Sequence, residues 1–290
     1  EELPAVFDPL EAIKPDAPLV HEDSGQYAST FDVKGRTGNV ACRTWFGCGD
    51  VEKGFAESDE VFEHTFSTQQ NHQTYLEPHA SLAQPDGRDG LTVWSSTQGV
   101  FNLQALVAKV WALPMTKVRV IGSIVGGGFG GKKPRADMYA AGLALRSGKP
   151  VLLQFTRDED FIAGLPRHPT TTTIRTGVKR DGRLMAREAK LYYDTGAYAD
   201  HGPNIAAGGA FYARGVYRVP NVKAEAYTVY TNKPISGAFR GYGAPQSIFA
   251  SESQMDIIAR ELGIDPIGLR RLNGMDHGDS LVNGQKLPEV

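Results

Sequence analysis

The chain has very little cysteine, with only Cys42 and Cys48 among its 290 residues. Two thiols are too few for a disulfide framework, and an iron–sulfur cluster usually needs four, so we expect two free, buried cysteines. No apolar run reaches the roughly 20 residues of a membrane-spanning helix. Residues 1–4 also lack the basic and apolar segments of a signal peptide. We therefore expect a cytoplasmic protein without a membrane anchor.

The chain also has no large excess of positive or negative charge. Lysine and arginine number 31 and aspartate and glutamate number 33, which gives a formal net charge of −2. Such a balance predicts neither nucleic acid nor an anionic membrane as a partner. The expected partners are a small-molecule substrate and other proteins.

What the chain does have is a cluster of five glycines in the segment Gly126–Lys132, GGGFGGK. The apolar residues 118–125 before it predict a buried strand, and residues 136–145 after it predict a helix. Glycine lets a backbone approach a ligand closely, and amides at the start of a helix attract anions. The loop therefore predicts a phosphate-bearing cofactor, although glycines that only pack a tight turn are an alternative.

Three classes of cofactor fit this loop. Gly126, Gly128 and Gly131 satisfy the dinucleotide pattern G-x-G-x-x-G, and the acidic residues 158–160 follow a second predicted strand. The loop also satisfies the first part of a phosphate-binding P-loop, but Lys133 stands where serine or threonine would hold Mg²⁺. The third candidate, a pterin cofactor, depends on residues outside the loop.

The predicted helices and strands mix without regular alternation, which indicates an α+β fold. Asp265 is a predicted helix N-cap, Gly263 ends the preceding helix, and residues 180–182 form the turn of a hairpin. Residues 1–30, which hold several prolines, are predicted to be an extended interdomain connector. The predicted strands are 91–96, 118–125, 151–155, 170–178, 184–193 and 222–230, and the predicted helices are 50–56, 100–110, 136–145, 245–262 and 266–272.

Several further motifs accompany the loop in a fixed order. They are QTYLEPH at 73–79, LTVWSSTQ at 91–98, RDED at 157–160, RHP at 167–169, DTGAY at 194–198, YRVPN at 217–221 and GAFRGYGAPQ at 237–246. In this order and spacing the chain resembles the molybdenum-binding subunit of the xanthine dehydrogenase/aldehyde oxidase family over about residues 27–284. Separate motifs in register arise by chance far less often than one glycine pattern.

The resemblance implies a molybdenum–pterin cofactor, as molybdopterin or its cytosine dinucleotide form. In the family the pterin dithiolene holds the metal, so no protein side chain is expected to ligate it. Gln98 corresponds to a glutamine whose amide, able to donate and to accept, faces an oxygen on molybdenum. Arg240 corresponds to an arginine near that oxygen, where a planar cation suits developing charge. Gln98 and Arg240 are thus the implied catalytic residues, and the implied cofactor-binding residues are Gly127, Gly128, Phe129, Gly130, Gln98 and Arg240.

The resemblance also narrows the substrate. Phe239 and Tyr242 correspond to aromatic positions that line the substrate cavity, and Lys133 either pairs with an anionic substrate or is solvated. The glutamate and arginine of purine oxidisers have no match near Lys133 or Gly208, and residues 236–240 lack the cysteine of carbon monoxide dehydrogenases. We therefore expect hydroxylation of an N-heteroaromatic or oxidation of an aldehyde.

Residues 31–290 resemble the first half of the family's molybdopterin-binding domain. The family's general-base glutamate lies beyond this region, and its iron–sulfur clusters and FAD lie on other domains. We expect a fragment or split subunit of a molybdenum-dependent oxidoreductase, inactive without its second half. Its expected partners are that half and the iron–sulfur and FAD subunits. A nucleotide-binding protein and a non-catalytic cofactor-binding module are the alternatives.

Overall fold

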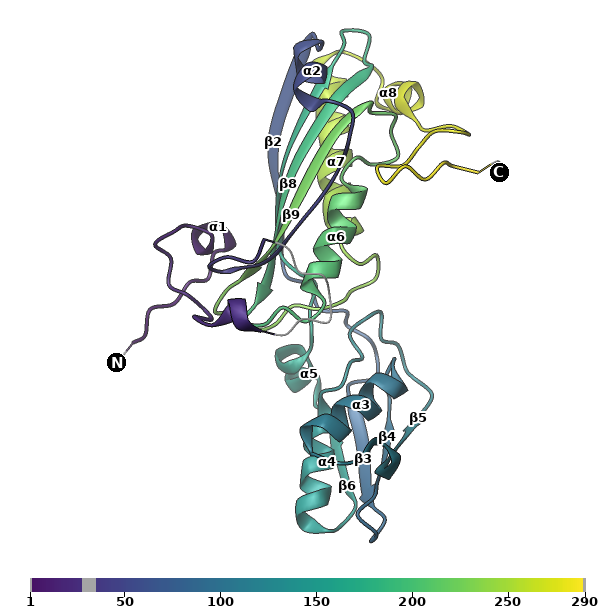
Figure 1. Cartoon of the computed structure of the whole chain (residues 1–290). Helices are drawn as coiled ribbons and strands as arrows, with labels where there is room; N and C mark the ends of the chain where they lie inside the picture. The colour runs from purple at the N-terminus through teal and green to yellow at the C-terminus, as the bar shows by residue number, and fades with distance from the viewer. Residues whose placement is uncertain (1, 28–34, 289–290) are drawn as a thin grey trace. The chain divides into compact units, whose positions relative to one another are not determined.

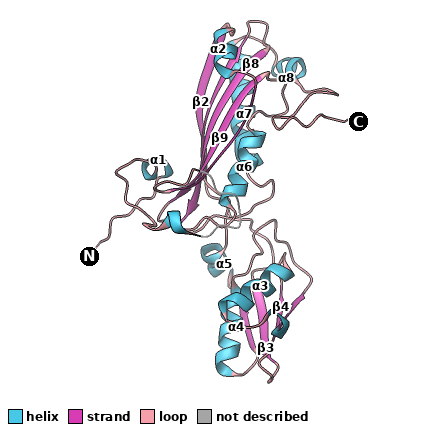
Figure 2. Cartoon of the chain, viewed as in Figure 1, coloured by secondary structure: helices cyan, strands magenta, loops and turns pink. Residues whose placement is uncertain are grey.

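The computed structural model describes residues 2–27 and 35–288 (Figures 1 and 2). The chain divides into two compact units, which we call the large-sheet unit and the small-sheet unit after their five- and four-stranded sheets. Strands and helices are mixed in both, which confirms the predicted α+β fold. The large-sheet unit comprises residues 1–70, 168–236 and 241–290, and the small-sheet unit comprises residues 71–167 and 237–240.

The large sheet has the strand order β1-β9-β8-β7-β2. Its pairs are antiparallel except for β8 and β9, which run parallel. Strands β7 and β8 form the predicted hairpin, and Gly182 in its turn has a φ of 90°. The strands are β1 (Val40–Cys48), β2 (Glu60–Thr68), β7 (Thr170–Val178), β8 (Leu184–Gly196) and β9 (Asn221–Tyr230).

Helices pack on the large sheet and close its core. Helix α6 contacts β1 and β9, and α7 contacts β7 and β2. Met255 and Ile258 of α7 are fully buried in this core. Helix α8 begins after Asp265, whose carboxylate accepts from the Gly268 amide at 2.7 Å, as the N-cap prediction requires. The helices are α1 (Pro9–Ala12), the 3₁₀ helix η1 (Ser24–Gln26), α2 (Val51–Ala56), α6 (Gly202–Tyr212), α7 (Ala244–Glu261) and α8 (Pro266–Asn273).

The N-terminal residues lie on the large sheet. Val6 and Ala12 pack against Val229 of β9. The Val6 amide donates to Asn232 Oδ1, and the Asn232 amide donates back to the Val6 carbonyl, both at 2.8 Å. The connector role of residues 1–30 and the domain boundary at residue 31 stay predictions.

The small sheet has the strand order β5-β4-β3-β6, with only β4 and β5 parallel. Helices α3 and α4 pack against it around a core that includes Val93, Leu103 and Ala140. Leu103 and Val107 are buried as their helical spacing predicts, whereas Val110 is 52% exposed. The elements are β3 (Ala80–Pro85), β4 (Leu91–Ser95), α3 (Val100–Val110), the 3₁₀ helix η2 (Met115–Lys117), β5 (Val118–Gly122), α4 (Ala136–Ser147), β6 (Val151–Gln154) and α5 (Arg157–Ala163).

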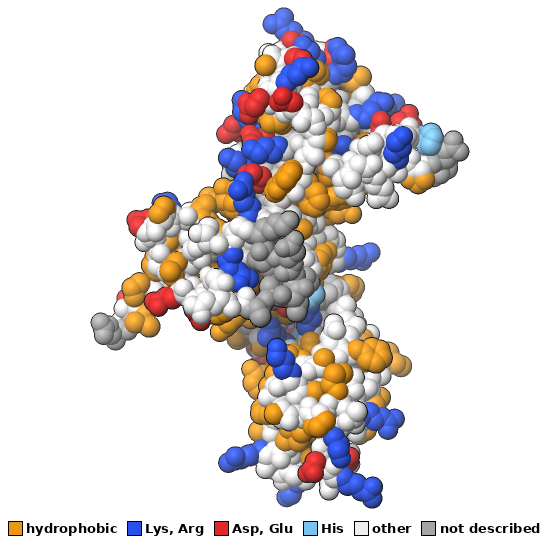
Figure 3. All heavy atoms as spheres, in the orientation of Figure 1, with side chains coloured by type: hydrophobic (Ala, Val, Ile, Leu, Met, Phe, Trp, Pro, Cys, Tyr) orange, Lys and Arg blue, Asp and Glu red, His pale blue; other side chains and the backbone are white. Residues whose placement is uncertain are grey.

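The two cysteines are free, but only Cys42 is buried, and Cys48 is half-buried, so the prediction of two buried thiols is correct for one of them. Across residues 2–27 and 35–288 we find no helix with the length and apolarity to cross a bilayer. Acidic and basic side chains are interspersed over the large-sheet unit on the face seen in Figure 3.

Candidate functional site

The glycine-rich loop lies between β5 and α4 in the small-sheet unit. Strand β5 ends at Gly122 and α4 begins at Ala136, so the loop does not lead directly into the helix and the predicted strand over 118–125 is too long. Beyond β5 the chain contacts Glu77: the Glu77 amide donates to the Gly126 carbonyl at 3.2 Å, and the Gly126 amide donates to Glu77 Oε2 at 2.8 Å. The expected anion site at the helix start is therefore not where the glycines are.

Most amides of the loop already have protein acceptors. The amides of Gly130 and Lys132 both donate to Gln98 Oε1, at 3.0 and 3.1 Å, and the Gly131 amide donates to the Gly128 carbonyl at 2.8 Å. Among the described residues, the amides of 127–129 have no acceptor. These three amides are therefore the backbone donors that the loop offers to a ligand. Successive amides can point at one acceptor when the backbone alternates between right-handed and left-handed conformations.

The glycines are required by close contacts within the protein. A Cβ atom on Gly128 would lie 2.6 Å from Gln98 Oε1, and one on Gly131 would lie 2.7 Å from Gln73 Cδ. On Gly130 it would lie 2.6 Å from the Ala238 carbonyl oxygen, in a backbone with a φ of 103°. Tight packing, the alternative to a ligand-binding role, thus explains part of the glycine content, because the loop backbone lies against Gln98, Gln73 and Ala238.

Phe129 is held in an unfavourable conformation in the middle of this loop. Its φ is 51°, a value that costs about 1–2 kcal/mol for a residue with a Cβ, and its side chain is 48% exposed. The Phe129 carbonyl accepts from the Arg240 amide at 2.9 Å. Local backbone strain of this kind is concentrated at functional sites, and here the contact with Arg240 helps to maintain it.

Gln98 follows β4 and faces the loop with one end of its amide. Both groups that contact its side chain are N–H donors, from Gly130 and Lys132, so the accepting atom must be the carbonyl oxygen. That oxygen is fully used, which leaves the side-chain NH₂ for a ligand. The prediction that Gln98 both donates to and accepts from a ligand stays a prediction, and the NH₂ group is the end of the side chain that has no acceptor among the described residues.

Arg240 is brought to the loop by a short segment from far along the chain. The Gly237 amide donates to the Pro166 carbonyl at 2.8 Å, and Gln73 Nε2 donates to the carbonyls of Leu165 and Ala238, both at 2.7 Å. The Arg240 carbonyl accepts from the Arg167 guanidinium at 2.9 Å. The Arg240 side chain itself is exposed and has no partner among the described residues.

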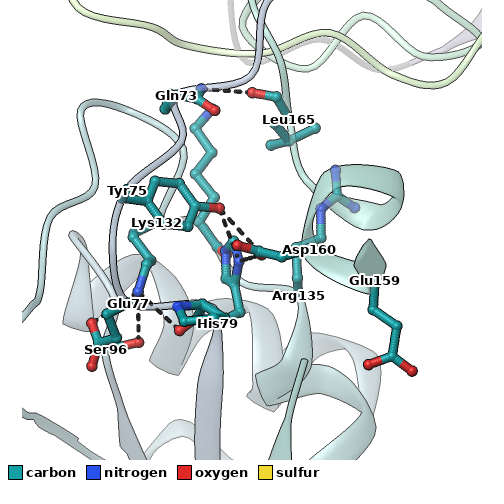
Figure 4. A network of polar contacts seen from close by, with 12 residues as sticks. Gln73, Tyr75, Glu77, His79, Ser96, Lys132, Arg135, Glu159, Asp160 and Leu165 are labelled. Carbon is teal, nitrogen blue, oxygen red and sulfur yellow. Dashed lines mark hydrogen bonds and ion pairs between the residues drawn. The ribbon is translucent and has the colours of Figure 1, made fainter. Parts of the chain in front are cut away.

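A buried polar network lies beside the loop (Figure 4). Asp160 Oδ1 contacts His79 Nδ1 at 2.5 Å, and His79 Nε2 lies 3.2 Å from the Lys133 carbonyl oxygen. Burial raises the pKa of Asp160, but the hydrogen bond from His79 and the electrostatic influence of His79 and His72 together outweigh it, and the pKa lies below its usual value. Burial also raises the pKa of Tyr75, whose hydroxyl donates to Asp160 at 3.3 Å.

The predicted substrate residues have separate surroundings. The Phe239 ring lies under the Arg167 guanidinium at 4.1 Å, and Lys133 is half-buried, with its amide donating to the Gly131 carbonyl. Tyr242 belongs to the large-sheet unit, where its hydroxyl lies 2.7 Å from His201 Nδ1. Burial raises the pKa of Tyr242.

Sequence reasoning assigned no role to four residues that build the site. Gln73, Glu77 and Arg167 lie within the motifs quoted for the resemblance, and Lys132 ends the glycine segment. Their contacts join stretches far apart in the sequence, such as Gln73 with Ala238. The only local signal was charge next to a glycine cluster, which does not distinguish a buried lysine from a solvated one.

Comparison with known proteins adds the identity of the fold. A model of the molybdopterin cofactor-binding domain matches residues 33–274. The chain belongs to this family. The predicted resemblance to xanthine dehydrogenases and aldehyde oxidases, and the pterin cofactor that it implied, are confirmed at the level of the family.

Individual relatives agree with this assignment. The chain is 39% identical over 274 residues to a probable xanthine dehydrogenase subunit of Bacillus subtilis (strain 168), a match that covers 94% of this chain and 35% of that protein. It is 38% identical over 288 residues to the nicotinate dehydrogenase large molybdopterin subunit of Eubacterium barkeri, covering 99% of this chain and 64% of the relative. It thus spans less than two thirds of either relative.

Solved structures show the same fold. The aldehyde oxidoreductase from Desulfovibrio gigas matches with a TM-score of 0.87 at 30% identity, covering 99% of this chain and 30% of that chain. Quinoline 2-oxidoreductase from Pseudomonas putida 86 matches with a TM-score of 0.85 at 28% identity, covering 99% and 36%.

The donors at the loop fit a molybdenum–pterin group. The amides of 127–129, the Gln98 NH₂ group and the Arg240 guanidinium all donate, and the Glu77 oxygen that contacts the loop is already bonded to Gly126. A phosphorylated pterin with a dithiolene is anionic and rich in acceptors, so it complements such a set.

Proposed function

We propose that the chain is the cofactor-binding part of a molybdenum hydroxylase, in which residues 127–130, Gln98 and Arg240 contact the molybdenum–pterin group. When bound, that group supplies the redox centre for adding a water-derived oxygen to an electron-poor carbon. The observation that carries the proposal is that hydrogen bonds join three separate segments of the small-sheet unit, around Gln98, residues 127–130 and Arg240, each of which carries donors without an acceptor among the described residues.

The residues of the chain have distinct tasks in this proposal. Gln98 donates one hydrogen bond toward an acceptor on the cofactor, in an orientation fixed by the two amides on its carbonyl oxygen. Arg240 supplies a permanent positive charge on a planar fork. The backbone at 127–129 supplies donors that no side-chain substitution removes.

We propose an N-heteroaromatic or an aldehyde as the substrate. Two relatives are named for nicotinate and quinoline, both N-heteroaromatics, and one for aldehydes. Nicotinate also carries the carboxylate that Lys133 would pair with. In this proposal Phe239 contacts the flat ring.

We further propose that activity requires polypeptide outside these 290 residues. The chain covers 35% of the Bacillus subtilis relative and 64% of the Eubacterium barkeri relative. The proposed partners are a second part of the molybdopterin domain and domains or subunits that carry iron–sulfur clusters and FAD. A stable chain that retains pterin but never supports turnover would be a non-catalytic cofactor-binding module instead.

The nucleotide-binding alternative has little support in the geometry. A dinucleotide loop presents free amides at a helix start between parallel strands, whereas here α4 begins at Ala136 and two of the loop amides are bonded to Gln98. Only β4 and β5 are parallel in the small sheet.

The test is the cofactor content of the native protein that carries this chain. We expect close to one pterin and one molybdenum per chain, and no rise in melting temperature with ADP or NAD, because a ligand stabilises only a protein that binds it. Protection by ADP or NAD in a preparation without pterin would establish the nucleotide alternative.

A further inference from the structure

Lys132 is an unusual residue for its position, since the whole residue has no exposed surface. Its ammonium has acceptors for all three protons, in Glu77 Oε2 at 2.9 Å, the Pro78 carbonyl at 3.2 Å and Ser96 Oγ at 3.3 Å. It also lies 4.9 Å from the centre of the Tyr75 ring. A buried charge is tolerated only when it is paired and hydrogen-bonded. The surroundings of this ammonium meet both conditions (Figure 4).

Glu77 connects this ammonium to the start of the glycine loop. The same oxygen that accepts from Lys132 also accepts from the Gly126 amide at 2.8 Å. The Glu77 amide returns a hydrogen bond to the Gly126 carbonyl. Although partial burial raises the pKa of Glu77, the hydrogen bonds from Lys132 and Gly126 bring it below its usual value. One carboxylate therefore holds both ends of the loop.

The backbone of Lys132 in turn orients Gln98. The Gln98 amide donates to the Lys132 carbonyl at 3.0 Å, and the Lys132 amide donates to Gln98 Oε1 at 3.1 Å. The Thr97 hydroxyl donates to the same carbonyl at 3.4 Å. A shift of Lys132 would therefore move both the backbone and the side-chain amide of Gln98.

We propose that Lys132 and Glu77 are positioning residues, whose ion pair fixes the glycine loop and aims the Gln98 NH₂ group at the cofactor. The part of this inference that concerns the cofactor rests on the proposed function. The part that says the ion pair fixes the loop does not depend on it. Neither residue contacts the ligand, and they act through Gly126 and Gln98.

The experiment uses the native holoprotein that carries this chain, with Lys132→Met, Glu77→Gln and the double variant. The matched control is Lys109→Met, at an exposed lysine of α3 in the same unit. Amide hydrogen exchange is measured over residues 126–133 and over 103–108 in the core of α3. Pterin loss on dilution and the electron paramagnetic resonance signal of partially reduced molybdenum are measured in parallel.

We expect each single variant to exchange roughly tenfold faster in the loop, the factor that corresponds to one lost hydrogen bond of about 1.4 kcal/mol. Exchange over residues 103–108 of α3 should be the same in these variants as in the parent, and the control variant should exchange like the parent in both segments. Pterin should dissociate about 10–100-fold faster, as for residues that orient the ligands of metal sites. The resonance signal should shift in the same way in both variants, and the double variant should resemble the singles because one pair is lost.

Unchanged loop exchange in folded Glu77→Gln or Lys132→Met would overturn the proposal, as would an unaltered resonance signal at full pterin content. If Lys132→Met does not fold, Ser96→Ala, which removes one neutral acceptor of the ammonium, should still accelerate loop exchange, and its failure to do so would count equally against the pair. If the native protein holds no pterin, the proposed function fails, whereas the exchange data still decide whether the pair fixes the loop.

Discussion

Gln98 offers a way to separate support of the loop from contact with the ligand. Gln98→Ala removes the carbonyl that accepts from Gly130 and Lys132 together with the outward NH₂ group. Gln98→Glu is nearly the same shape and keeps an oxygen for the two loop amides. It replaces only the donor that faces the ligand with an acceptor.

The expected magnitudes follow from these contacts. Each accepted hydrogen bond contributes about 0.5–1.5 kcal/mol, so Gln98→Ala should lower the free energy of unfolding by about 1–3 kcal/mol. For a protein of this size, each kcal/mol shifts the melting temperature by about 2–4 °C. Gln98→Glu should be no less stable than the parent near neutral pH, because hydrogen bonds from amides to a carboxylate are about twice as strong.

The assay compares melting temperature with pterin and molybdenum content in the two variants. Gln84→Glu, at an exposed glutamine of β3, controls for the added charge. We expect Gln98→Ala to be destabilised and poor in cofactor, and Gln98→Glu to be stable and equally poor in cofactor or turnover. If Gln98→Glu keeps both full cofactor and full turnover, the donor role of Gln98 is refuted. If Gln98→Ala melts like the parent, the supporting role is refuted.

Three further predictions test other parts of the structure. Because the pKa of Asp160 is lowered in the folded state, its stabilisation is present above the unfolded value of about 3.9 and is lost as the pH falls through the folded value. Urea unfolding should therefore show the curves of the parent and Asp160→Asn converging as the pH is lowered from about 6 to 3, and parallel curves would contradict this role. Gly142→Ala places a Cβ 2.3 Å from Trp111 Cζ2. Overpacking of about 1–3 kcal/mol should outweigh the gain in helix propensity, so the melting temperature should fall. The control Gly25→Ala, whose new Cβ has no atom within 4 Å, should leave the melting temperature unchanged. If Lys133 binds a substrate carboxylate, Lys133→Ala should raise KM for the acid much more than for its uncharged amide, by a free energy above the ~0.2–1 kcal/mol of an exposed ion pair, and equal changes would exclude the contact.

Local sequence predicted several elements closely because their signals are local. The helix expected over 245–262 is observed at 244–261, and the hairpin around Gly182 and the cap at Asp265 are where turn and cap chemistry placed them. Strands β1, β2 and β3 and helix α6 carried no comparable signal. Helix α6 contains adjacent glycines that disfavour a helix in isolation, yet Gly209 is needed where the Tyr193 hydroxyl passes too close for a Cβ.

The sequence by itself determined the family, the pterin cofactor and the candidate residues Gln98, Phe129 and Arg240, because motifs in a fixed order survive without knowledge of their contacts. Only the tertiary structure shows that the Gln98 side-chain oxygen accepts from two loop amides, and that the buried lysine beside the loop is Lys132. The reason is that a donor or acceptor is available to a ligand only if no protein group is bonded to it. The groups bonded to Gln98 and Lys132 come from segments that are far apart in the sequence and meet only in the folded chain.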